Sequence, residues 1–248
     1  MLIMVTISEQ DFWPKLKKHI LPRIKAILLA ERPNAGSNAQ ARVDNESQVE
    51  LDGILFKDDR MYRHKVLRIN YTTYDVRRAQ DTVNPNTARR DIMLLSNLQT
   101  EPNSCVHQFK YARVLGIFHT NVIYIGPGML DYCARCVEFL WVRWYQNIES
   151  SPVQDGWRDC QLDQLGFPPM DHPDAFGFVD PAHVIRAFHS IPRFVSGQQY
   201  RDGVGISKCS RDSNDWRRYF VNRWVFTSCS PCHYHIDMRL SALLIEIW

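Results

Sequence analysis

Two cysteines and two histidines near the end of the chain are spaced closely enough to do chemistry together. Cys229, Cys232 and His233 form a C-x-x-C-H motif, and His235 follows it. The motif has two chemical interpretations: covalent attachment of c-type haem, or a tetrahedral zinc site completed by the C-x-x-C pair at 133–136. Haem attachment needs an export route, which the opening "MLIMVT" does not offer, and the two cysteine pairs lie far apart in sequence. We therefore expect ordinary thiols and no cofactor.

The stretch 137–145 is the most aromatic part of the chain and contains "FLWVRWY". In a strand, alternate side chains point to opposite faces, and here both faces are largely apolar. The pattern predicts a central strand with one face on a core and the other beneath a helix, loop or ligand. Such rings can hold a methylated ammonium by cation–π attraction, while packing in the core explains the same pattern, and we assign Trp144 to that core. The candidate binding residues are Tyr111, Trp141, Arg143 and Tyr145.

Lysine and arginine residues occur in short runs, but the net charge is only +3 over 248 residues. This charge is too small to indicate nucleic-acid or membrane binding by itself, so any such site must be local. A solvated surface is the ordinary explanation of such runs, and phosphate binding is the alternative. The candidate nucleic-acid residues are Lys15, Lys17, Lys18, Arg77, Arg78, Arg89, Arg90, Arg217 and Arg218.

Motifs of the common enzyme classes are missing from the sequence. There is neither a G-x-S-x-G elbow nor a glycine-rich phosphate loop, so we expect a non-enzymatic protein. Seven cysteines and the lack of a recognisable signal peptide predict an intracellular protein with reduced thiols. No run of about 18 apolar residues occurs, so no membrane partner is expected.

Two helices are predicted from apolar spacing and capping residues. Residues 8–31 place apolar side chains three and four positions apart. We expect Pro22 to kink or split this helix, because an interior proline removes a backbone donor. The second helix is predicted over 181–188, with Asp180 as its N-cap and Pro181 at its first position.

Short runs rich in β-branched and aromatic residues predict strands between these helices and one strand after them. The clearest run alternates Leu67, Ile69 and Tyr71 with polar residues. No helical pattern separates the runs, which favours antiparallel pairing. We therefore expect an α+β, β-rich fold built on a small antiparallel barrel or curled sheet with flanking helices. The other predicted strands are 91–96, 111–125, 137–145 and 216–226.

The same patterns predict how the chain is divided. We expect an N-terminal helical segment over 1–32, a linker over 33–48, a β-rich module over 49–223 and an atypical tail over 224–248. The linker is polar and rich in turn-forming residues, and it shows no hydrophobic period. The oligomeric state cannot be predicted from these patterns.

An ordered series of motifs resembles a known group of proteins. The series "MYRHKVLRINYTTYDVRRAQDTVNPNT", "YARVLGIFHTNVIYIGPG", "EFLWVRWY", "AFGFVDPAHVIRAFHSIPRF" and "DWRRYFVNR" is similar to the C-terminal region of uncharacterised fungal proteins related to Plavaka-type transposases, relatives of the CACTA elements. The resemblance implies a transposon-derived protein with DNA or chromatin proteins as partners and a nuclear location. The "YARVLGIFH" and "FLWVRWY" strands also resemble chromatin-reader barrels of the bromo-adjacent-homology and Tudor type.

Two features of the resemblance bear on function. In that group the acidic catalytic core of the transposase lies upstream of this region, so no catalytic residue is carried over. After Arg223 the chain departs from the family pattern, which indicates a shifted reading frame or a retained intron and makes the C-x-x-C-H motif accidental. We therefore expect a non-enzymatic interaction module associated with chromatin or DNA. The alternatives are a nucleic-acid-binding segment and a zinc-stabilised module.

Overall fold

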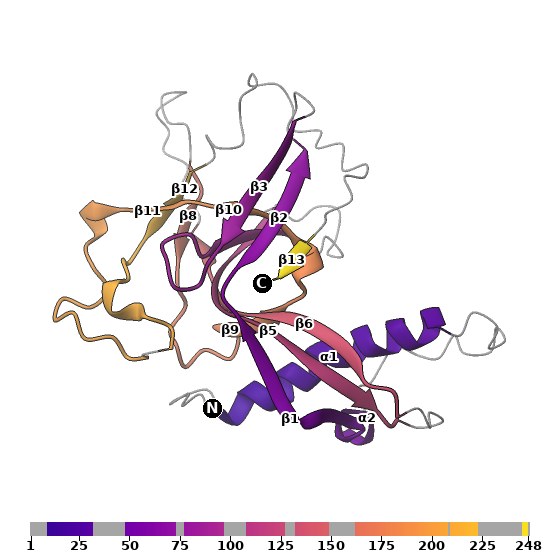
Figure 1. The fold of residues 1–248 in the computed structure, drawn as a ribbon. Coiled ribbons are helices and arrows are strands. Elements are labelled where there is room, and N and C mark those ends of the chain that lie inside the picture. Colours follow the sequence, from indigo (N-terminus) through magenta and orange to yellow (C-terminus); the bar gives the residue numbers. More distant parts are fainter. Residues whose placement is uncertain are drawn as a thin grey trace, which may run out of the picture. The chain divides into compact units, whose positions relative to one another are not determined.

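Antiparallel strands are the main secondary structure in the computed structural model of this chain (Figure 1). The predicted linker lies almost wholly outside the described residues, and so does most of the tail after residue 222. The structure describes residues 9–31, 48–72, 77–96, 108–126, 132–148, 162–207, 209–222 and 245–247.

The chain forms two units, and each unit is made from two separate stretches of sequence. Unit 1 comprises residues 1–63 and 118–139, and unit 2 comprises residues 64–117 and 140–248. This division differs from the expected β-rich module over 49–223. The reason is that β1 pairs with β5, so residues early in that module group with the N-terminal helix. The elements of unit 1 are α1 (Glu9–Glu31), α2 (Gln48–Asp52), β1 (Ile54–His64, whose last residue belongs to unit 2) and parts of β5 (Phe109–Tyr124) and β6 (Arg135–Trp144).

Helix α1 confirms the predicted N-terminal helix. Its buried face repeats every four residues through Leu16, Ile20, Ile24 and Leu28, each at most 2% exposed. The helix is not split at Pro22, which lies on the exposed side. Its hydrophobic stripe therefore continues across the missing backbone donor.

Polar contacts hold α1 to the other elements of unit 1. The Nη1 atom of Arg23 donates to the carbonyl oxygen of Glu138 in β6 at 2.5 Å. Lys25 forms a 2.7 Å ion pair with Glu50 in α2. These contacts hold the C-terminal half of the helix against β6 and α2.

Unit 2 contains the remaining strands, arranged in open antiparallel sheets. The largest sheet has the order β10-β4-β5-β6-β9, and β1 of unit 1 also pairs with its strand β5. Two smaller sheets have the orders β11-β12-β8-β7 and β13-β2-β3. No sheet closes into a barrel within the described part of the chain, so the closed-barrel alternative is not seen. The elements are β2 (Leu67–Thr72), β3 (Arg78–Val83), β4 (Asp91–Leu95), β7 (Gln146–Ile148), β8 (Gln164–Gly166), β9 (Phe176–Val179), η1 (Pro181–His183), β10 (Val184–Phe188), β11 (Ser190–Pro192), η2 (Phe194–Ser196), η3 (Asp212–Asn214), β12 (Tyr219–Val221) and β13 (Ile245–Ile247).

Short apolar runs in the sequence correctly predict four strands of the structure. Leu67 and Ile69 in β2 are fully buried and lie in one cluster with Ala112 and Val114 of β5. Leu140 of β6 belongs to the same cluster. The predicted strands at 67–72, 91–96, 111–125 and 137–145 correspond to β2, β4, β5 and β6, whereas the strand predicted at 216–226 is reduced to β12.

The helix predicted over 181–188 is wrong beyond its first turn. Asp180 does cap a turn, because its side chain accepts a hydrogen bond from the backbone N–H of Ala182 at 2.9 Å. That turn is a short 3₁₀ helix, η1, and the chain then continues as β10, which pairs with β4. Val184 and Phe188, the buried ends of β10, are four residues apart, a spacing that places side chains on one face of a helix. In the strand, a register shift between Val184 and Arg186 puts them in two different core clusters.

Candidate functional site

The aromatic residues proposed as a binding surface are buried in the structure. Tyr111, Trp141, Arg143 and Tyr145 are between 2% and 8% exposed. Trp141 packs against Phe176 with ring centroids 6.2 Å apart. These rings are thus covered and do not form an open cage for an ammonium group. The burial agrees with a central strand that has both faces covered.

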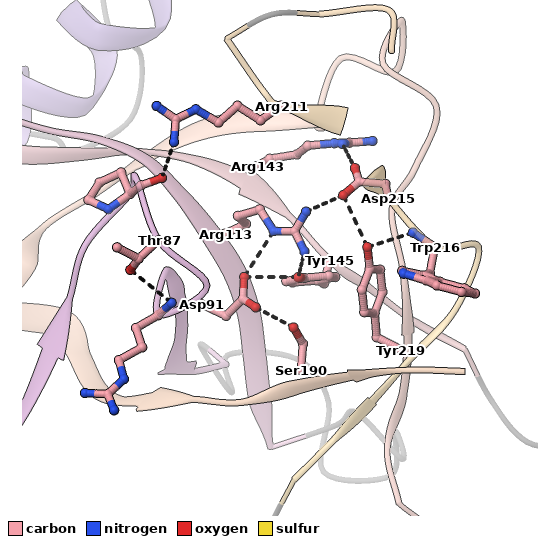
Figure 2. Close-up of polar contacts among 12 residues, drawn as sticks. Thr87, Asp91, Arg113, Arg143, Tyr145, Ser190, Arg211, Asp215, Trp216 and Tyr219 are labelled. Atoms are coloured by element: carbon pink, nitrogen blue, oxygen red, sulfur yellow. Dashed lines mark hydrogen bonds and ion pairs between the residues drawn. The ribbon is translucent and has the colours of Figure 1, made fainter. Parts of the chain in front are cut away.

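Arg113 lies at the centre of a buried polar network in unit 2 (Figure 2). It is directly opposite Asp91 in the β4–β5 pairing, and its Nε atom lies 3.2 Å from Asp91 Oδ1. Its Nη1 atom donates to Asp215, which also accepts from Arg143 Nη1 at 2.7 Å. Two guanidinium groups and two carboxylates therefore neutralise one another away from solvent.

Hydroxyl groups complete this network. The Tyr145 hydroxyl accepts from Arg113 Nη2 at 2.8 Å and donates to Asp91 Oδ1 at 3.1 Å. The Tyr219 hydroxyl donates to Asp215 Oδ1 at 3.2 Å, and the Ser190 hydroxyl donates to Asp91 Oδ2 at 2.5 Å (Figure 2). The two carboxylates thus receive donors from several strands and loops, which fixes how these elements meet.

The ring of Phe167 lies against both guanidinium groups of the network. Its centroid is 4.6 Å from Cζ of Arg113 and 3.9 Å from Cζ of Arg143, and it stacks on Tyr145 at 4.2 Å. Such contacts are favourable where the cation is desolvated. Nε of Arg143 is buried without a hydrogen-bond partner among the described residues. Since nearly every other polar atom is paired, the network is best explained as a device that holds the strands together.

Burial raises the pKa of the Tyr145 phenol well above its usual range; the charge of Arg113 opposes this effect and Asp91 adds to it. Above about pH 10, the usual pKa of tyrosine, the unfolded chain releases this proton and the folded chain retains it. The free energy of unfolding must therefore fall as the pH rises through this region.

We expect Tyr145→Phe to reduce the slope of the unfolding free energy against pH by up to about 1.4 kcal/mol per pH unit. Urea unfolding between pH 9 and 11 measures it. The exposed Tyr132→Phe is the control, and equal slopes for Tyr145→Phe and wild type would contradict the prediction.

Unit 1 contains a pocket of about 360 Å³, near the lower end of the range for small-ligand sites. Leu16 of α1 is fully buried within it, whereas Trp13, one turn earlier, is 48% exposed. The Trp13 ring lies 5.4 Å from Phe56 of β1 at an angle of 55°. The pocket thus has an aromatic wall open to solvent. Its lining residues are Trp13, Leu16, Lys17, Phe56, Asp59, Arg60, Met61 and Thr120.

The backbone of β1 is distorted beside this pocket. Asp58 and Asp59 both have left-handed conformations, with φ angles of 58° and 49°. Consecutive left-handed residues are unusual inside a strand and cost free energy, and such distortions concentrate at edges and binding sites. Here the distortion places Asp59 and Arg60 in the pocket lining. No motif in the sequence predicts this pocket; the one signal of it is Trp13, an aromatic residue one position outside the apolar stripe of α1.

The candidate nucleic-acid residues are divided between the two units. Lys15, Lys17 and Lys18 lie on α1, and Lys17 lines the pocket of unit 1. The arginines belong to unit 2, where Arg90 is half-buried and its pKa is lowered by burial and by the charge of Arg113. The candidate set is therefore not confined to one unit. The exposed arginines of the set are Arg77, Arg78, Arg89, Arg217 and Arg218.

The structure describes two of the cysteines considered as metal ligands, Cys133 and Cys136. The thiols of Cys133 and Cys136 are exposed, and no group of three or more potential ligands occurs in the described ranges. The tail candidates lie outside those ranges; they are Cys229, Cys232, His233 and His235. Among the described helices, none is long and apolar enough to cross a membrane.

Comparisons with protein-family models, curated proteins and solved structures find no match to this chain. The resemblance to transposon proteins thus rests on the ordered sequence motifs alone.

Proposed function

We propose that this chain is a non-enzymatic interaction module of a transposon-derived protein, and that it associates with DNA or chromatin through the pocket of unit 1. This proposal rests mainly on the half-exposed Trp13, which lines one pocket together with Lys17 and Arg60. An exposed tryptophan is costly to leave in water and is common at recognition surfaces. The adjacent cations match a partner that carries phosphate groups.

The distribution of ionisable side chains supports a binding role over a catalytic one. The carboxylates of Asp91 and Asp215 and the phenol of Tyr145 are buried and hydrogen-bonded to Arg113. Acid–base catalysis needs a titrating group within hydrogen-bond reach of the substrate. In the pocket, the Thr120 hydroxyl already donates to the carbonyl oxygen of Arg60 at 2.9 Å. The remaining polar groups there are better suited to holding a ligand by charge.

The curled-sheet likeness to chromatin readers forms part of the same proposal. β5 and β6, the strands that carry the likeness, are neighbours in the largest sheet. Their aromatic residues would act as core, so recognition is assigned to unit 1. A methylated ammonium is disfavoured there, because Lys17 and Arg60 outnumber the single carboxylate of Asp59 in the pocket lining.

Binding of duplex DNA should weaken steeply as salt is added. If about three cations contact phosphates, raising the salt from about 50 to 200 mM should reduce affinity about 40-fold. Replacing both Lys17 and Arg60 with alanine should lower the slope of log K against log salt by about two. Fluorescence anisotropy with a labelled duplex measures both effects. A matched pair, Arg217→Ala with Arg218→Ala, distinguishes contacts in unit 1 from contacts in unit 2. No binding at low salt would contradict the association with DNA.

A further inference from the structure

The shape of the pocket in unit 1 constrains what can occupy it. Trp13 contacts Phe12 edge-on at 5.4 Å and Phe56 at 5.4 Å, so its ring is held in place on one side. About half of its surface remains exposed. A flat apolar ring can stack on this free surface, and the loss of side-chain freedom is small because the tryptophan is already oriented. The aromatic side of the pocket, formed by Trp13 and Phe56, favours an aromatic ligand over a branched aliphatic one.

The charges around the pocket select among aromatic ligands. Lys17 lies on α1 one turn after Trp13, and Arg60 lies on β1, so cations from two elements line the same pocket. This arrangement favours a ligand with negative groups near its ring and disfavours a cation. The Asp59 carboxylate, which only accepts hydrogen bonds, gives a polar ring an acceptor for an amino group. A fatty acid would use neither the aromatic wall nor this acceptor.

We infer that the pocket binds an unpaired base of single-stranded nucleic acid. The base stacks on Trp13, Lys17 and Arg60 contact the neighbouring phosphates, and Asp59 accepts from the base amino group. Aromatic stacking beside a basic surface is the general way in which proteins hold single strands. In a duplex the bases are stacked on one another, so only an unpaired base can enter. This inference rests on the proposed association with DNA.

The test compares one labelled oligonucleotide as a single strand and as a duplex, using the full chain and fluorescence anisotropy at low salt. The oligonucleotide is rich in cytosine, and we expect its single strand to bind more tightly than its duplex. Trp13→Ala should weaken single-strand binding by about five- to 150-fold and leave duplex binding unchanged. Trp13→Phe should retain part of the affinity, because its ring can still stack. Tyr132→Ala, an exposed aromatic in the same unit, is the control and should change nothing.

A second comparison tests the role of the carboxylate. Oligo(dC) offers an amino group that oligo(dT) lacks, so we expect oligo(dC) to bind about three- to tenfold more tightly. Asp59→Asn should reduce this preference. Unchanged single-strand affinity in Trp13→Ala would overturn the inference, even if duplex binding persists and sustains the proposed function. Failure to bind either form of DNA would overturn both.

Discussion

Arg113→Met is expected to lower the free energy of unfolding by about 3–5 kcal/mol, because it leaves buried carboxylates without their counter-charge. Asp91 and Asp215 both contact this guanidinium, and all three residues are at most 4% exposed. Methionine fills similar space but donates no hydrogen bond. Arg143 would then be the remaining cation in contact with Asp215, and Asp91 would keep only hydroxyl donors among its described contacts.

The measurement is urea unfolding together with hydrogen exchange read by mass spectrometry. Exchange should accelerate in β4 and β12, which lie next to the network in unit 2. Arg89→Met is the matched control, since Arg89 is exposed in the same unit and should change stability by no more than about 0.5 kcal/mol. A loss below about 1 kcal/mol for Arg113→Met would show that the network contributes little.

Phe139→Ala is expected to cost about 3–5 kcal/mol through the cavity it leaves in unit 1. The side chain is completely buried and stacks on Phe118 with centroids 5.7 Å apart. Surrounding strands can relax only partly into a space of this size, so both the transfer free energy and the lost contacts contribute.

Hydrogen exchange distinguishes this variant from Arg113→Met. Phe139 belongs to unit 1, so the amides of α1 should lose protection first. Tyr132→Ala is the control, because it removes a comparable ring that is 67% exposed. Equal stability of Phe139→Ala and Tyr132→Ala would contradict the buried position of this strand.

The strands were predictable where burial alternates over several residues. Leu67 and Ile69 fix the two-residue period of β2, and the continuous apolar runs of β5 and β6 fit central strands. β10 was predicted as a helix because its capping residues are real and its two buried side chains are four apart, the spacing of one helix face, while the register shift between Val184 and Arg186 interrupts the two-residue period of a strand. Pairing with β4, a long-range contact, decided the outcome, and no local pattern encodes it.

The candidate sites were harder to predict because their members are distant in sequence. Arg143 was selected for its place in an aromatic strand, and a lone charge on a buried strand does indicate a polar partner. That partner, Asp215, lies 72 residues away and has no local signature. Trp13 carries a different signal, because it is an apolar aromatic residue that lies outside the apolar stripe of its helix. Only the pairing of β1 with β5 shows what surrounds it.

The interleaved order of the two units has a consequence for how the chain is made and cut. Unit 1 needs residues 118–139 as well as the N-terminal helix, so it cannot finish folding on the ribosome until both stretches have emerged. The intervening stretch, 64–117, belongs to unit 2 and must wait for residues beyond 139. A fragment that ends between residues 64 and 117 would therefore lack part of both units.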